Sequence, residues 1–126
     1  MNGDKIPLRM SPRAFRLACW LPPCIYAAVI FYLSSLPGDT YFPSFFSADK
    51  VLHVGEYAVL GYLVARALGN YGLTKKKLFI RALALCVLYG ISDEVHQMFV
   101  PHRFPSVMDI LADGLGSSLG IGIYIK

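Results

Sequence analysis

Ionisable and polar side chains recur every three or four residues at three places in an otherwise strongly apolar chain. Residues at this spacing share one face of an α-helix. Carboxylates and imidazoles share protons, act as general acids and bases, and bind divalent cations. The spacing therefore predicts three helices whose polar stripes could combine into one chemical site. The three stripes are Asp49, His53, Glu56 and Tyr57; Tyr89, Asp93, His96 and Gln97; and Ser106, Asp109 and Asp113.

The composition indicates a membrane protein. The chain has 126 residues, of which 56% are hydrophobic and only 16% are charged, whereas soluble domains carry about 25% charged residues. A length of 126 residues predicts one domain, over residues 1–126. The net charge is +4, but the basic residues flank apolar segments and form no basic patch with exposed aromatics. Nucleic acid is therefore not an expected partner.

Four segments are long and apolar enough to position these stripes across a bilayer, because a helix needs about 20 residues to cross it. We predict an all-α membrane protein, a bundle of four transmembrane helices. Pro22 and Pro23 interrupt the first segment, which predicts a kink or a late helix start there. A cleaved signal peptide is the alternative for this segment, and we favour a retained helix. The predicted spans are residues 17–36, 48–69, 78–100 and 106–125.

The charges predict the orientation of the bundle. With alternating spans, ten of the twelve Lys and Arg residues lie on one side, and only Lys50 and Arg103 lie on the other. The positive-inside rule then places both termini in the cytoplasm. Seven of the eight acidic residues and all three histidines fall in the opposite, outer half. The polar stripes are therefore expected at the extracytoplasmic ends of the second, third and fourth helices.

Burying these charges constrains how the helices meet. A charged side chain that faces lipid costs several kcal/mol, so we expect the stripes to face one another around one polar cavity. Six acids in this region oppose two basic residues, and such an excess cannot stay ionised and dry. Shared protons, charged histidines or a bound divalent cation could each relieve it. The sequence contains no local metal motif, so no cofactor is established and a divalent cation is possible.

Several of these residues have simpler interpretations. Asp49 and Ser106 could be helix N-caps. Glu94 lies about 100° around the helix from Asp93, so it could reach outward or pair with Arg103. Gly116 and Gly120 form a small-residue face, which we assign to packing inside the bundle in preference to a homodimer. The loop over residues 37–46 could lie across the cavity mouth.

Two segments resemble one known family. They read "DKVLHVGEYAVLGYL" and "YGISDEVHQMFVPHRFPSVMDILADGLGSSLG", and together they are similar to the VanZ-like family of small bacterial membrane proteins. The resemblance covers residues 48–120. Asp113 departs from the pattern, because the family often has Asn there. The matching positions are Asp49, Lys50, His53, Asp93, Glu94, Gln97, Arg103 and Asp109.

The resemblance implies a role in the bacterial cell envelope. The member that names the family is associated with low-level resistance to the glycopeptide teicoplanin. The resemblance also implies a multi-pass protein of the cytoplasmic membrane. Its implied partners are membrane lipids or a lipid-linked cell-wall precursor, with a possible glycopeptide link. The candidate substrate-binding residues are Asp49, Lys50, Glu56, Tyr57, Glu94, Gln97, Arg103 and Asp113, and the candidate catalytic residues are His53, Asp93, His96 and Asp109.

Three functions remain open at this point. The first is an outer-face protein that binds or modifies an envelope lipid or wall precursor. The second is a membrane-embedded hydrolase or transferase in which His53 or His96 is the general base, oriented by Asp93 or Asp109, with Arg103 stabilising negative charge. The third is a proton- or cation-coupled lipid translocator. Whether the protein is an enzyme, what it binds and how it oligomerises are left open.

Overall fold

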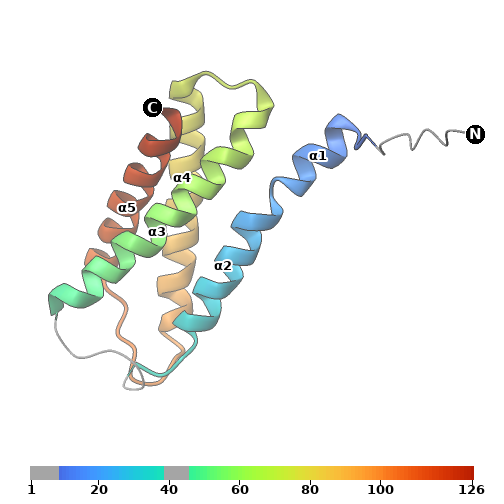
Figure 1. Ribbon diagram of the computed structural model, residues 1–126. Helices are drawn as coiled ribbons and strands as arrows, with labels where there is room; N and C mark the ends of the chain where they lie inside the picture. The colour runs from blue at the N-terminus through green and yellow to red at the C-terminus, as the bar shows by residue number, and fades with distance from the viewer. Residues whose placement is uncertain (1–8, 39–45) are drawn as a thin grey trace, which may run out of the picture.

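The computed structural model describes residues 9–38 and 46–126, with the side chains of residues 46–48 excepted. Within these residues the only regular secondary structure is helical, and there is no strand. Most of the predicted outer loop, and with it the prediction about the cavity mouth, lies outside the described residues. The elements are α1 (Pro12–Ala18), α2 (Leu21–Ser34), α3 (Phe46–Leu68), η1 (Gly69–Tyr71), α4 (Lys75–Gln97) and α5 (Val107–Ile125) (Figure 1).

Three parts of the described chain are long and apolar enough to cross a membrane. They are Pro12–Ser34, Asp49–Tyr71 and Val107–Ile125, which correspond to the first, second and fourth predicted spans. Large apolar side chains such as Leu17, Leu111 and Ile123 are 60–70% exposed, which suits contact with lipid better than contact with water. The membrane-protein prediction is therefore supported for three spans. α4 is as long as α3, at 23 residues, but is more polar, and its insertion stays a prediction.

The first predicted span consists of two helices. α1 ends at Ala18, and α2 begins at Leu21 with Pro22 and Pro23 in its first turn. Proline fits there because the first turn of a helix has no intrahelical partner for its N–H groups. The predicted interruption at the two prolines is thus confirmed as a helix break followed by a new start.

α3 and α5 pack at backbone distance over most of their length (Figure 1). A Cβ atom added to Gly116 would collide with the carbonyl oxygen of Val54, and one added to Gly120 would collide with that of Ala58. Gly61 on α3 lies equally close to the backbone of Ser117 on α5. The small residues therefore serve packing inside the bundle, as predicted.

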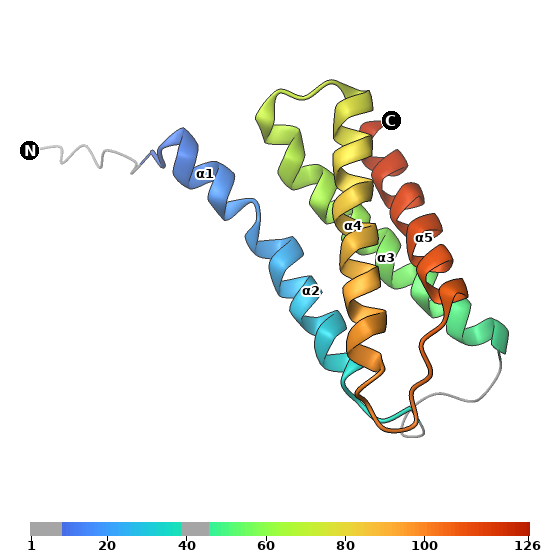
Figure 2. The ribbon, with the colours of Figure 1, turned by 180° about the vertical axis from the view of Figure 1, so that it is seen from behind.

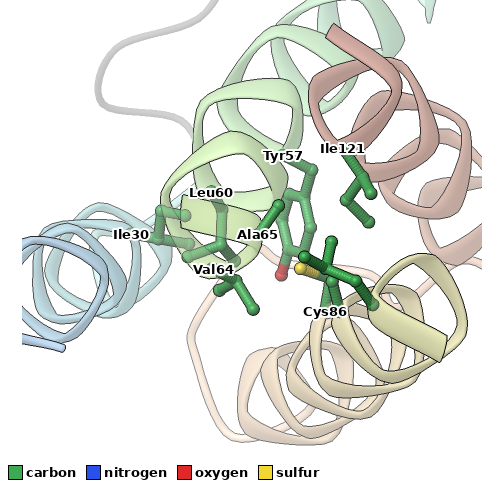
Figure 3. Packing of buried hydrophobic residues seen from close by; sticks show 9 residues of the cluster. Ile30, Tyr57, Leu60, Val64, Ala65, Cys86 and Ile121 are labelled. Carbon is green, nitrogen blue, oxygen red and sulfur yellow. The ribbon is translucent and has the colours of Figure 1, made fainter. Parts of the chain in front are cut away.

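A buried apolar cluster joins α2, α3, α4 and α5 in the middle of the bundle (Figure 3). Tyr57, Ala65 and Ile121 are fully buried in it, and Ile30 brings in α2 from the side. Cys86 of α4 belongs to the same cluster, where its thiol packs as a small apolar side chain.

The helix directions bring four helix ends together. The C-terminal ends of α2 and α4 and the N-terminal ends of α3 and α5 lie at one end of the bundle, at the bottom of Figures 1 and 2. The start of α1, the α3–α4 connection and the end of α5 lie toward the other end. We call the first of these the polar end, because all three polar stripes lie there.

Candidate functional site

The three polar stripes do meet at the polar end. They lie on the first turns of α3, the last turns of α4 and the first turns of α5, and most of their members are buried. The Ser106 hydroxyl caps α5 by accepting a hydrogen bond from the Met108 amide at 3.2 Å, so the predicted N-cap is present. The buried polar side chains of this end are Ser34, His53, Asp93, Glu94, Gln97, Asp109 and Asp113.

His53 and Asp113 form the innermost pair. His53 Nδ1 lies 2.7 Å from Asp113 Oδ1, and the two residues are 7% and 1% exposed. An ionised carboxylate only accepts hydrogen bonds, so Nδ1 is the donor of this pair. His53 Nε2 then faces the other way, 3.9 Å from Asp49 Oδ1 and 4.0 Å from Asp109 Oδ2. Asp113 thus fixes the imidazole ring and leaves its second nitrogen toward the outer carboxylates.

Lys50 links α3 to α5 at the outer edge of the site. Its ammonium donates to Asp109 Oδ1 and lies 3.5 Å from Asp49 Oδ2. The Asp49 side chain is 42% exposed, while that of Asp109 is 7% exposed. Lys50 therefore compensates the charge of the two outermost carboxylates of the site.

Glu94 points inward, which corrects the prediction that it reaches outward or pairs with Arg103. Its Oε2 accepts a hydrogen bond from the Ser106 amide at 2.8 Å, and the residue is only 4% exposed. Its Oε1 has no hydrogen-bond partner among the described residues. Gly90, one turn earlier on the same face of α4, lets Asp113 approach closely. That glycine was the sequence signal that this face of α4 packs on α5.

His96 faces α2, which corrects the prediction that it shares a cavity with His53. Its ring stacks on Phe31 with centroids 4.4 Å apart, and its Nε2 lies 2.9 Å from Ser35 Oγ. The physical reason is the helical period: His96 is about 200° around α4 from Glu94, so the two side chains cannot face the same neighbour. The Ser35 hydroxyl, which the sequence analysis missed, also donates to the Phe31 carbonyl at 2.7 Å.

Asp93 and Gln97 contact α2 as well. Gln97 Nε2 donates to Ser34 Oγ at 3.0 Å. Asp93 is 4% exposed, and its Oδ1 has no hydrogen-bond partner among the described residues. Ser34 was also missed by the sequence analysis, although the adjacent serines at the end of a predicted span were a signal of a polar helix end.

Arg103 stabilises the end of α2. Its Nε donates to the Leu36 carbonyl at 3.1 Å and its Nη2 donates to the Leu33 carbonyl at 3.2 Å. The last carbonyls of a helix have no intrahelical partner, and a cation there also interacts favourably with the helix dipole. Arg103 therefore lies at the site as a cation, as predicted, but two of its N–H groups are already bonded to the end of α2.

Two cavities open between these side chains. The inner one has a volume of about 30 Å³ and lies between α2, α3 and α4. The outer one has a volume of about 160 Å³ and is bordered by Asp109, His102 and Phe104. Tyr57 borders neither and belongs to the apolar cluster. Four residues border both cavities: Asp49, His53, Gln97 and Arg103. The inner cavity is also lined by Glu56, Asp93 and Ser34.

Two sets of side chains have the geometry to hold a metal ion among the described residues. Both contain His53: one adds Asp49 and Asp109, and the other adds Glu94 and Asp113. In each set, one possible ligand atom per residue lies within 4.8 Å of the others. The site can thus exchange protons, accept hydrogen bonds from hydroxyls and amines, or bind a divalent cation.

These features define a helical membrane protein with a buried polar site where its helices end. A family model described as VanZ/LLP1 matches residues 19–125, nearly the whole chain. The chain belongs to this family. Neither the curated proteins nor the solved structures contained a match to the chain.

Proposed function

We propose that the protein spans the bacterial cytoplasmic membrane four times, with both termini in the cytoplasm and the polar end outside. α4 would be the third span in chain order, shielded by α2, α3 and α5 at its polar end. Arg66, at the end of α3, and Lys75–Lys77, at the start of α4, lie at the end opposite the polar site. This charge separation supports the orientation by the positive-inside rule.

We further propose that the polar end binds or modifies a cell-envelope lipid or a lipid-linked wall precursor. The observation that carries this is the order of two cavities between α2, α3 and α4. One to two helical turns from the inner cavity, toward the opposite end of the bundle, lies an apolar cavity of about 150 Å³. Its near edge is formed by Ala27 of α2, Leu60 of α3 and Tyr89 of α4. Each of these lies about one turn from a residue of the inner cavity. A molecule with a polar head and an apolar chain fits that order.

Lipid binding can be tested by native mass spectrometry of the protein in mild detergent. Ala27→Trp places an indole in the apolar cavity, while Ala28→Trp places one on the exposed side of the same helix. We expect the wild type and Ala28→Trp to retain a copurifying lipid, and Ala27→Trp to lose most of it. Equal retention by both variants, or no lipid on the wild type, would contradict the proposal.

A role in resistance is tested in cells. Overexpression should raise the teicoplanin concentration needed to inhibit growth several-fold, deletion should lower it, and His53→Ala should behave like the deletion. Unchanged susceptibility after both deletion and overexpression would reject the glycopeptide link and leave lipid binding as the function.

One observation favours a second candidate, a hydrolase or transferase. His53 is held by Asp113 through Nδ1, its Nε2 lies 3.9 Å or more from the outer carboxylates, and the residue borders both polar cavities, so a substrate proton could reach Nε2 as a general base requires. Asp113 takes the orienting role that the sequence analysis gave to Asp93 or Asp109. Incubation of the purified protein with a membrane lipid extract should then convert one lipid to a new mass, and Asp113→Asn should slow that conversion. Binding without any change of mass would leave the first function alone.

A further inference from the structure

We propose that His53, Glu94 and Asp113 bind one divalent transition-metal cation, such as Zn²⁺ or Mn²⁺, between α3, α4 and α5. The inference concerns the same site as the proposed lipid function but does not rest on it, because metal binding is measured without lipid. These three residues are called the inner triad below.

The geometry of the inner triad suits one ion. Each residue comes from a different helix, and one possible ligand atom per residue lies within 4.8 Å of the other two. All three residues are more than nine-tenths buried. Because α5 contacts α3 at backbone distance, two of the three ligands are held on a rigid pair of helices.

Unpartnered oxygens point to a missing ligand. Glu94 Oε1 and Asp113 Oδ2 are buried and accept no hydrogen bond from the described residues. A buried carboxylate oxygen without a partner has lost its hydration without gaining a hydrogen bond, and that is destabilising. A single cation bound between the triad would replace the proton by which His53 Nδ1 donates to Asp113, because a ligating nitrogen must be deprotonated. It would also satisfy both unpartnered oxygens and compensate their charge together.

The outer set, Asp49, His53 and Asp109, is the weaker candidate. The Lys50 ammonium already contacts both of its carboxylates. Asp49 is also the most exposed of the five possible ligands. The compensated charge and the exposure of this set both favour the inner triad.

The ligand types select the class of metal. Mg²⁺ and Ca²⁺ prefer sites made of oxygen ligands, whereas one imidazole with two carboxylates suits Zn²⁺ or Mn²⁺. Three protein ligands leave a tetrahedral ion one open position. That position would be available to a water molecule or to an oxygen of a bound headgroup.

The test is metal content after stripping and reloading. The detergent-solubilised protein is treated with a chelator, incubated with Zn²⁺ or Mn²⁺ at micromolar concentration, passed through a desalting column and analysed by inductively coupled plasma mass spectrometry. We expect about one ion per chain and a higher melting temperature than for the stripped protein. Less than a tenth of an ion per chain, with an unchanged melting temperature, would overturn the proposal.

Matched variants locate the ion. Glu94→Gln and Asp113→Asn should lower metal content at least tenfold, while Asp93→Asn should not change it. Asp93 is a fair control because it is as buried as Glu94, lies next to it on α4, and also has an unpartnered oxygen, yet lines the α2 side. Retention by all three variants, or equal loss in all three, would overturn the assignment to the inner triad.

Asp49→Asn and Lys50→Ala separate the inner from the outer set. Neither residue belongs to the inner triad, so both variants should still bind one ion. Loss of metal in Asp49→Asn with retention in Glu94→Gln would assign the ion to the outer set and overturn the proposal. If the Glu94 and Asp113 variants fail to fold, metal content of the wild type and of these two outer variants still decides it.

Discussion

The two sides of this helix bundle are packed in opposite ways. α5 lies against α3 so closely that three glycines mark positions where no Cβ atom fits. α2 makes far fewer contacts with α3 and α4, and the apolar and inner polar cavities lie along that side. The difference separates two tasks. The α3–α5 side holds His53, Asp109 and Asp113 at fixed separations, and the α2 side gives a ligand room to approach them.

The largest effect should come from adding a methyl group to the closely packed α3–α5 side. In Gly120→Ala the new Cβ would collide with the Ala58 carbonyl, so the helices must separate. We expect a loss of about 3 kcal/mol in the free energy of unfolding, the upper end for overpacking. SDS titration followed by circular dichroism would measure it.

Gly122→Ala is the control for that change. Gly122 lies on the same helix with nothing within 4 Å of an added Cβ atom. Alanine is the better helix former, so this variant should gain about 0.5–1 kcal/mol. Equal and small effects of the two substitutions would mean that α3 and α5 pack less closely than the structure shows.

The closely packed α3–α5 side was predicted from the sequence better than the loosely packed α2 side. Apolar length gave the second span as residues 48–69 and the fourth as residues 106–125, close to Phe46–Leu68 and Val107–Ile125. The spacing of Gly116 and Gly120 gave the mode of packing. These features are local and periodic, and both properties can be read directly from a chain.

The site was predicted only in part, because periodicity shows which residues share a face but not which helix that face meets. α4 has neighbours on two sides, so Glu94 turned to α5 while His96 turned to α2. The partners of Arg103 are backbone carbonyls, which every residue has and no sequence pattern distinguishes. Ser34 and Ser35 were missed because their importance depends on where α2 ends.

Arg103→Ala should have an intermediate effect on stability, confined to the α2 side of the bundle. Loss of two charged hydrogen bonds to the end of α2 should cost about 2 kcal/mol. Hydrogen–deuterium exchange should speed up in the last turn of α2 and stay unchanged in α5. Arg103→Lys keeps the charge but can replace only part of the two-pronged contact, so we expect an intermediate rate. Faster exchange in α5 would show that Arg103 supports the whole bundle.

The smallest effect should come from Tyr89→Phe, which removes one hydroxyl between α4 and α2. That hydroxyl donates to the Ala27 carbonyl at 2.5 Å, beside the apolar cavity. A single hydrogen bond contributes about 1 kcal/mol, so the loss in the free energy of unfolding should be of that size. Tyr62→Phe is the control, since the Tyr62 hydroxyl makes no hydrogen bond to the described residues.

The double variants test whether the two sides are independent. Tyr89 and Arg103 both attach α2, so once one contact is lost the other should be worth less, and their effects should fall short of additivity. Tyr89→Phe and Gly120→Ala act on different sides, and their effects should add within about 0.5 kcal/mol. Additivity in the first pair combined with strong coupling in the second would mean that α2 and the α3–α5 pair respond as one unit, and the division of tasks between them would not hold.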